Sequence, residues 1–275
     1  MPESFSQELE AAKEIAVAAG AILLEHYAGA PVVEWKGVGD PVTSADRAAS
    51  GFISAELKRR FPGDFILSEE ESDSMERLSR PRVWIVDPMD GTKEFIARVG
   101  EFAVMIGLSV GGRPVVGAVY DPTNATLYFA AAGQGAFVSD GRETRPMRVN
   151  GESDPARARI ALSRSHPSIR VDRVRRRMNI RNSIQRGSIG LKIALICEGK
   201  AHLYLHINDH TSQWDTCAPD AILREAGGRL TDTDGAALTY NRRETRNLRG
   251  VVATNGVIHD RVVKALQEER ALEKK

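Results

Sequence analysis

Residues 83–92 read Val-Trp-Ile-Val-Asp-Pro-Met-Asp-Gly-Thr, an apolar strand that ends in two carboxylates and a hydroxyl. Asp87 and Asp90 repel each other, and a nearby cation would compensate that repulsion. Glu69 follows another short apolar segment, and Asp215 stands at the start of an apolar helical stretch. Hard oxygen ligands of this kind suit Mg²⁺ or Mn²⁺. The sequence therefore predicts a divalent-metal site whose ligands come from several elements.

Each acid taken alone also has an ordinary structural interpretation. Asp-Pro and Asp-Gly are common in turns, and a glutamate run such as 69–71 is usually a solvated surface. Asp46 follows a polar loop at 37–45 and is a plausible N-cap of the next helix. The joint occurrence of these acids at the ends of apolar elements favours the metal site.

The composition limits the classes of function. The 275 residues carry 38 Lys and Arg against 37 Asp and Glu, a formal net charge of +1. This balance gives no general attraction for nucleic acid or for an anionic membrane. Cys197 and Cys217 are too few for a disulfide framework and lie in apolar helical patterns, so we expect buried thiols. Without a signal pattern or an apolar run of about 18 residues, we expect a cytoplasmic protein with no membrane span.

Apolar residues recur first at helical spacing and later in short β-like runs. Two amphipathic helices come first, consecutive hairpins follow the Asp-Gly-Thr turn, and strands alternate with helices from about residue 157. Pro219 lies near the start of the helix predicted from Asp215, where proline is tolerated. The predicted helices are 5–27, 46–61, 171–178, 188–198 and 215–226, and the predicted strands are 66–68, 83–86, 102–110, 114–120, 126–131, 160–162 and 201–206.

The order and local sequence of the acids resemble the inositol monophosphatase superfamily. Its pattern is a Glu-Glu pair, then Trp-Ile-x-Asp-Pro-x-Asp-Gly-Thr, then Trp-Asp before an apolar helix that ends in Gly-Gly. This chain has those motifs at 69–70, 84–92, 214–215 and 227–228. The resemblance covers nearly the whole chain and implies a layered α/β/α/β/α sugar-phosphatase fold. It also implies an N-terminal α+β half, about residues 1–150, and a C-terminal α/β half, 151–275, with the metals between them.

Within that superfamily, residues 91–95 (Gly-Thr-Lys-Glu-Phe) resemble the CysQ-type 3′(2′),5′-bisphosphate nucleotidases, whereas inositol monophosphatases more often carry Thr-Asn-Phe there. Residues 67–70 and 163–166 agree with the nucleotidases. At 187–192 the chain reads Gly-Ser-Ile-Gly-Leu-Lys, one residue longer from serine to lysine than the typical Gly-Ser-Ser-Leu-Lys.

The resemblance implies a phosphatase that converts 3′-phosphoadenosine 5′-phosphate to AMP, a reaction of sulfur metabolism. An inositol-phosphate or other sugar-phosphate phosphatase on the same scaffold is the alternative. A non-catalytic metal- or nucleotide-binding protein is a third class, and it would be expected to have lost a metal ligand or the pair of Thr92 and Asp46. The chain has lost none of these.

The resemblance also implies a role for each residue of the site. Two or three Mg²⁺ ions are expected, with Mn²⁺ as a substitute and inhibition by Li⁺. Thr92 and Asp46 would orient a metal-bound water and take its proton, so that no covalent intermediate is needed. Glu70 would be an outer group or a ligand of a third ion. The implied ligands are Glu69, Asp87, Thr92 and the Met89 carbonyl for one ion, and Asp87, Asp90 and Asp215 for the other.

Substrate contacts are expected from donors around the metals. The amides of Gly91 and Thr92 would meet phosphate oxygens, and Glu69 would support catalysis as a ligand. Taken by itself, His166 would be an exposed loop histidine and Lys192 a solvent-exposed helix lysine. The expected partner is a small phosphorylated nucleotide, and the expected assembly is a monomer or a homodimer. The candidate nucleotide contacts are Ser163, His166, Ser188 and Lys192.

Overall fold

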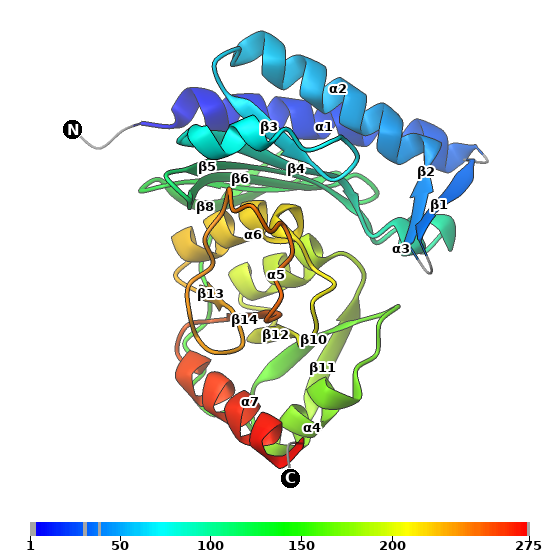
Figure 1. Cartoon of the computed structure of the whole chain (residues 1–275). Helices are drawn as coiled ribbons and strands as arrows, with labels where there is room; N and C mark the ends of the chain where they lie inside the picture. Colours follow the sequence, from blue (N-terminus) through cyan, green and yellow to red (C-terminus); the bar gives the residue numbers. More distant parts are fainter. Residues whose placement is uncertain (1–3, 30–31, 38–39, 274–275) are drawn as a thin grey trace.

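The computed structural model describes residues 4–29, 32–37 and 40–273. Layers of helices alternate with β-sheets in the fold (Figure 1). A pair of helices covers one face of a seven-stranded sheet, and a second helix pair separates this sheet from a five-stranded one. Two further helices cover the far side of the smaller sheet. The layered α/β/α/β/α fold expected from the sequence is confirmed.

The outer layer consists of α1 (Ser6–Ala28) and α2 (Ser44–Arg60). Both bury apolar stripes, represented by Leu23 and Ile53, against the larger sheet, because one face of each helix is apolar at helical spacing. The strand order is β3-β4-β5-β6-β7-β8-β9, with β3 parallel to β4 and all other pairs antiparallel. The strands are β3 (Phe65–Ser68), β4 (Arg82–Asp90), β5 (Ala103–Val110), β6 (Arg113–Asp121), β7 (Thr126–Ala131), β8 (Gly135–Ser139) and β9 (Thr144–Met147).

The middle layer consists of α5 (Ile189–Cys197) and α6 (Gln213–Glu225), which are almost entirely buried. Glycines in the larger sheet allow α6 to approach it closely. A Cβ atom at Gly117 would lie 2.2 Å from the Ala218 carbonyl oxygen, and one at Gly107 would lie 2.8 Å from the Cys217 sulfur. Both cysteines are buried and free, as expected. The N-termini of α5 and α6 are thereby held beside the end of β4.

The second sheet has the order β11-β10-β12-β14-β13. Its first strands are parallel, and β14 pairs antiparallel with β12 and β13. Strands up to Met147 belong to the first sheet and strands from Arg159 to the second; a division into halves at about residue 150 stays a prediction. The remaining elements of this part are β10 (Arg159–Ser163), α4 (Ile169–Arg177), β11 (Asn182–Arg186), β12 (Leu203–His206), β13 (Arg229–Thr231), β14 (Val251–Thr254) and α7 (His259–Glu273).

Three short elements complete the fold: the hairpin β1 (Val33–Gly37) and β2 (Asp40–Thr43), the 3₁₀ turn η1 (Met75–Ser79) and the helix α3 (Thr92–Ile96). The predicted polar loop at 37–45 is therefore wrong in part, because β2 pairs with β1 and runs directly into α2. Residues 38–39 of that loop lie outside the described residues.

Two predicted helix starts are also wrong by two residues. Thr43, not Asp46, is the N-cap of α2, because its hydroxyl accepts hydrogen bonds from the amides of Ala45 and Asp46. Likewise α6 begins at Gln213 with Ser212 as its N-cap, so Asp215 lies inside the first turn. Pro219 then sits within the helix rather than near its start, and its missing N–H removes one bond from the helical ladder. Capping boxes explain both shifts, since the acid in the third helical position bonds back to the cap residue.

None of the helices in the described part of the chain is long and apolar enough to cross a membrane.

Candidate active site

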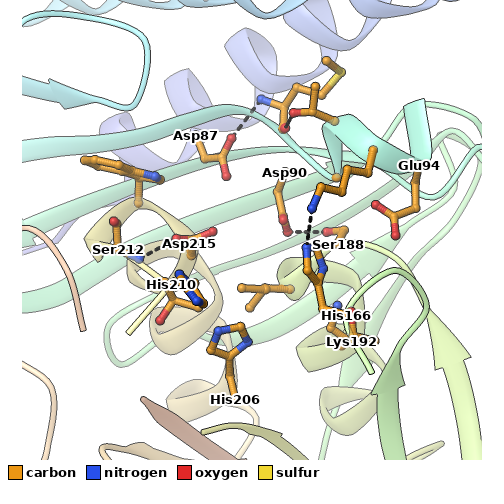
Figure 2. A pocket seen from close by; sticks show the side chains of 18 of the residues that line it. Asp87, Asp90, Glu94, His166, Ser188, Lys192, His206, His210, Ser212 and Asp215 are labelled. Carbon is orange, nitrogen blue, oxygen red and sulfur yellow. Dashed lines mark hydrogen bonds between the residues drawn. The ribbon is translucent and has the colours of Figure 1, made fainter. Parts of the chain in front are cut away.

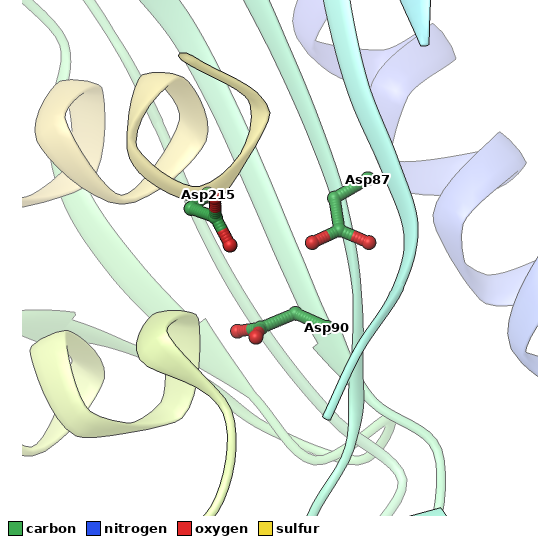
Figure 3. Close-up of side chains that lie close together, drawn as sticks. All are labelled: Asp87, Asp90 and Asp215. Carbon is green, nitrogen blue, oxygen red and sulfur yellow. The ribbon is translucent and has the colours of Figure 1, made fainter. Parts of the chain in front are cut away.

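Asp87, Asp90 and Asp215 converge where the end of β4 meets the first turn of α6 (Figure 3). One carboxylate oxygen of each lies within 4.8 Å of those of the other two. Asp87 is 1% exposed and Asp90 is 8% exposed. The structure thus brings together three acids that the sequence analysis identified as ligands, although Asp215 is far from the other two in the chain.

A bulge in β4 explains how Asp87 and Asp90 can share one site. The predicted strand ended at Val86, but β4 continues to Asp90, with Asp87 opposite Met105 and Asp90 opposite Ala103. The register shifts between the two aspartates, so β4 has one more residue than its partner over this stretch. Side chains three apart in a regular strand point to opposite faces, and the extra residue turns both carboxylates toward the same side.

Burial and mutual repulsion make this cluster electrostatically costly. Burial, followed by the charges of Glu69, Asp90 and Asp215, raises the pKa of Asp87 well above its usual range. Burial, followed by the charges of Asp90 and Glu69, raises the pKa of Asp215. The pKa of Asp90 is also raised by burial, although Lys192 opposes this. A divalent cation would relieve the repulsion, and a donor set made of carboxylate oxygens fits Mg²⁺ or Mn²⁺.

The other predicted metal ligands lie beside the three aspartates. Glu69 follows β3 and lines the same cavity, and Met89 and Thr92 line it too. The Thr92 hydroxyl donates to the Met89 carbonyl oxygen over 3.3 Å. Glu70 is half-buried next to Glu69 but does not line this cavity.

Thr92 and Asp46 are brought together at the starts of two helices. The Thr92 hydroxyl donates to Asp46 Oδ1 over 3.3 Å. The other oxygen, Asp46 Oδ2, accepts from the Thr43 amide and hydroxyl, each at 2.7 Å. Asp46 is 2% exposed and lies behind Thr92, which itself faces the cavity. Asp46 can therefore act on a bound substrate only through Thr92.

The cavity measures about 510 Å³ and lies between the two sheets (Figure 2). Figure 2 shows Asp87, Asp90 and Asp215 around one end of it, His206 below them, and His166 beside Lys192. All six residues that the sequence analysis chose as substrate contacts line it: Gly91, Thr92, Ser163, His166, Ser188 and Lys192.

Ser188 and Lys192 occupy positions that the sequence did not predict in detail. Ser188 is the N-cap of α5, and its hydroxyl donates to Asp90 Oδ2 over 2.5 Å. Lys192 lies one turn further along, so the serine and lysine face the cavity together. Lys192 is only 3% exposed, so the exposed helix lysine considered earlier is wrong: α5 is packed between two sheets. Burial lowers the pKa of Lys192, while Asp90 and Glu94 oppose that change.

His166 is exposed on the loop after β10, as a loop histidine is expected to be. Its Nε2 lies 2.8 Å from the Lys93 ammonium nitrogen. Partial burial and then the Lys93 charge lower the pKa of His166. The imidazole therefore favours its neutral form and can accept a hydrogen bond from Lys93.

Several cavity residues were missed by the sequence analysis. Glu94 is 4% exposed and accepts a hydrogen bond from the Ser165 hydroxyl at 2.5 Å. His206 Nε2 is buried and has no hydrogen-bond partner among the described residues, and burial lowers the pKa of His206 to about 4. A signal existed, because three of the six histidines lie within residues 202–210, just before the Trp-Asp motif. The other missed lining residues are Pro41, Lys93, Ile189, Tyr204, Asn208, His210, Thr211, Ser212 and Trp214.

Comparisons with known proteins agree with this geometry. The sequence profile of the inositol monophosphatase family matches residues 5–271. The 3′(2′),5′-bisphosphate nucleotidase CysQ of Salmonella typhimurium is 37% identical over 240 residues, 86% of this chain and 95% of that protein. Inositol monophosphatase 3 of Solanum lycopersicum is 32% identical over 275 residues, 96% of this chain and 98% of that protein.

A solved structure shows the same fold. CysQ from Bacteroides thetaiotaomicron, described as a bacterial member of the inositol monophosphatase family, superposes with a TM-score of 0.79 at 31% identity. The match covers 92% of this chain and 98% of that one. The chain belongs to the inositol monophosphatase family.

Proposed function

We propose that this protein is a Mg²⁺-dependent phosphomonoesterase that removes the 3′-phosphate of 3′-phosphoadenosine 5′-phosphate to give AMP. The observation that carries the proposal is the convergence of Asp87, Asp90 and Asp215 within 4.8 Å at one end of a cavity of about 510 Å³. The choice of a nucleotide is supported by the 37% identity to the Salmonella nucleotidase and by the Gly-Thr-Lys-Glu-Phe sequence at 91–95.

We assign the metal ligands from the acids of the cavity. Asp87 is assigned as the shared ligand, because the charges of Glu69, Asp90 and Asp215 all act on it. Mn²⁺ is expected to substitute for Mg²⁺. Glu70 is assigned either to a position just outside the metal ligands or as a ligand of a third ion. When bound, Mg²⁺ would neutralise charge on the phosphate oxygens and lower the pKa of a water molecule, which then attacks phosphorus directly. The proposed sets are Glu69, Asp87, Thr92 and the Met89 carbonyl for one ion, and Asp87, Asp90 and Asp215 for the other.

The residues of the chain supply positioning and proton transfer. The Thr92 hydroxyl faces the cavity and is oriented by Asp46 Oδ1, so it can accept a hydrogen bond from the attacking water and assist removal of its proton. Gly91 and Thr92 line the cavity at the start of α3, and we assign their amides to phosphate oxygens. Water enters the reaction as the nucleophile, and no side chain needs to form a covalent intermediate.

The cavity residues around the acids are proposed to hold the rest of the nucleotide. Lys192 faces the cavity, and its positive charge acts on Asp90, whose raised pKa it opposes. Ser163, the last residue of β10, and His166, in the loop after it, also line the cavity. These groups supply both charged and neutral hydrogen-bond partners, which a base, a ribose and a second phosphate together require.

An inositol-phosphate or other sugar-phosphate phosphatase is the second candidate. It is favoured by the Solanum lycopersicum relative, whose 32% identity extends over 96% of this chain. The metal centre would be the same in both cases, since every phosphomonoester presents the same group to it. Only the remote contacts distinguish the two functions.

The test is phosphate release from four substrates: 3′-phosphoadenosine 5′-phosphate, inositol 1-phosphate, fructose 1,6-bisphosphate and NADP, each with Mg²⁺. The nucleotide bisphosphate is expected to give the highest kcat/KM, excess chelator to abolish turnover, and Li⁺ to inhibit it. A preference for inositol 1-phosphate would establish the second candidate instead. Full turnover in chelator would overturn the metal assignment, and no release from any substrate would favour a binding protein.

A further inference from the structure

The turn formed by Gly187 and Ser188 has an unusual backbone. Ser188 has φ 54° and ψ 134°, a combination that L-amino acids rarely adopt. Such a conformation is strained and persists only where the surroundings enforce it. The turn lies directly in front of α5 and beside Asp90, so its strain is located at the candidate metal centre.

Two carboxylates enforce this turn from opposite sides. Asp90 Oδ2 accepts the Ser188 hydroxyl at 2.5 Å and the Gly190 amide at 2.9 Å. On the other side, Glu101 Oε2 accepts the Gly187 amide at 2.6 Å. The approach is so close that a Cβ atom at Gly187 would lie 2.5 Å from the Glu101 carbonyl oxygen. Residue 187 must therefore lack a side chain for Glu101 to reach its amide.

Glu101 is itself fixed by two arginines. Arg164 donates to both of its carboxylate oxygens, at 2.8 and 2.9 Å, and Arg186 lies 3.6 Å away. Arg186 is held in turn by Asp121 at 2.7 Å. Glu101 is 8% exposed. Burial alone would raise the pKa of Glu101, but Arg164 and the Gly187 amide lower it below its usual range, so the group is a carboxylate at neutral pH.

We propose that Glu101 is a positioning residue for the metal centre: it holds the strained Gly187-Ser188 turn so that the Ser188 hydroxyl fixes Asp90. With Oδ2 of Asp90 occupied by two donors, the orientation of its carboxylate toward Asp87 and Asp215 is set by the turn. Arg164 lies between Ser163 and His166 in the chain, so Glu101 also links the proposed nucleotide contacts to the metal ligands. The inference rests on the proposed metal-dependent function and adds a residue that is not itself a ligand.

The variant that tests this is Glu101→Gln, which keeps the shape of the side chain and removes its charge. We expect at least a tenfold weaker affinity for Mn²⁺, measured without any substrate by the electron paramagnetic resonance signal of the free ion. In steady-state assays the Mg²⁺ concentration for half-maximal rate should rise by the same factor. At saturating Mg²⁺, kcat should return to within about threefold of wild type.

The matched control is Glu225→Gln. Glu225 also accepts two backbone amides, those of Gly133 and Gly135 at 3.0 and 2.9 Å, but it lies outside the cavity. This variant should bind Mn²⁺ as wild type does. Equal losses in both variants would show a general structural effect and would overturn the proposal.

A double-mutant cycle with Ser188→Ala identifies the route of the effect. If Glu101 acts through Ser188, Glu101→Gln should cost little further Mn²⁺ affinity in the Ser188→Ala background. Additive losses, or unchanged affinity in Glu101→Gln, would overturn the proposal. If Glu101→Gln does not fold, Ser188→Gly replaces it, because glycine tolerates the positive φ while the Ser188 hydroxyl is removed. Wild-type Mn²⁺ affinity in Ser188→Gly would also overturn the proposal.

Because the Mn²⁺ binding measurements use metal and no nucleotide, a wrong substrate assignment leaves them intact. Failure of the wild-type protein to bind Mn²⁺ would instead overturn the proposed function itself.

Discussion

The Thr92 hydroxyl donates to Asp46 Oδ1 over 3.3 Å, although the two residues are 46 positions apart. The same carboxylate completes the capping box of α2 with its other oxygen, Oδ2. One side chain thus uses one oxygen for the stability of the helix and the other to orient a hydroxyl that faces the cavity. The two roles of Asp46 can be separated by substitution.

Asp46→Asn should lower kcat by about 10²-fold, a size typical of losing general-base assistance. The amide oxygen can still accept from Thr43, but the amide nitrogen is a donor and cannot accept the Thr92 hydroxyl. Melting temperature should change little. Thr43→Ala is the comparison: it should cost about 1 kcal/mol of stability through the lost cap and keep most activity. If both variants lose activity only in proportion to their loss of stability, Asp46 stabilises the helix and has no role in catalysis.

Asp87→Asn should reduce kcat at least ~10²-fold, because a group that holds charge at the reacting phosphate is lost. In metal-free protein the same change should raise the melting temperature. The reason is that burial and the charges of Glu69, Asp90 and Asp215 oppose ionisation of Asp87, as its raised pKa shows. Calorimetry with and without Mg²⁺ measures this, and wild-type stabilisation by Mg²⁺ should be reduced in the variant. Asp90→Asn should lose activity to a similar degree.

Asp220→Asn is the control for a buried aspartate outside the cluster. Asp220 pairs with Arg224 at 2.7 Å and accepts from the Tyr240 hydroxyl at 3.0 Å. Its substitution should therefore lower stability, by about 3 kcal/mol for a broken buried pair, while the response to Mg²⁺ remains. A rise in the metal-free melting temperature of Asp220→Asn as well would show that relief of repulsion is not specific to the metal cluster.

Lys192→Met should lower kcat/KM for 3′-phosphoadenosine 5′-phosphate by about tenfold or more, or about 1.4 kcal/mol for a lost charge-assisted contact. Methionine keeps much of the buried stem and removes the ammonium nitrogen, which lies 5.2 Å from the centre of the Tyr204 ring. Inositol 1-phosphate hydrolysis at saturating Mg²⁺ should be spared. Lys200→Met, at an exposed lysine, is the control and should match wild type. Equal losses on both substrates would remove Lys192 from nucleotide selection.

Acid should destabilise the protein through buried histidines. Burial lowers the pKa of His259 to about 4, and its two ring nitrogens lie 3.0 Å from the hydroxyls of Thr231 and Thr254. The unfolded histidine has a pKa of about 6.5, so between these values the unfolded state binds more protons and stability falls as pH falls. The loss is on the order of 3 kcal/mol between pH ~6.5 and ~4.

Denaturant unfolding across this pH range measures the effect. His259→Gln should be less stable than wild type near pH 8 and should lose less stability on acidification. Thr231→Val removes one hydrogen-bond partner of His259 and keeps the titrating imidazole. Its free energy of unfolding should be lower at every pH, with the same dependence on pH as in wild type. If the free energy of unfolding of His259→Gln depends on pH as it does in wild type, His259 is not the cause of the acid destabilisation.

Local sequence alone was sufficient to choose the acids of the cluster and most of the elements that carry them. Asp87 and Asp90 end an apolar strand, and Asp215 stands in the first turn of an apolar helix; both contexts are readable because hydrophobic periodicity spans only neighbouring residues. Two helix starts were predicted two residues too late. Asp46 and Asp215 have the residue type of an N-cap, but each is the third helical residue of a capping box whose N-cap is Thr43 or Ser212.

Tertiary structure alone decided the geometry of the site. The bulge between Asp87 and Asp90 depends on pairing with β5, and the burial of Lys192 depends on α5 lying between two sheets. Glu101 has no local signal, because its partners Arg164 and Gly187 are 63 and 86 positions away. Contacts at such separations arise only when the sheets pack, so sequence determined which groups were present and packing determined how they were oriented.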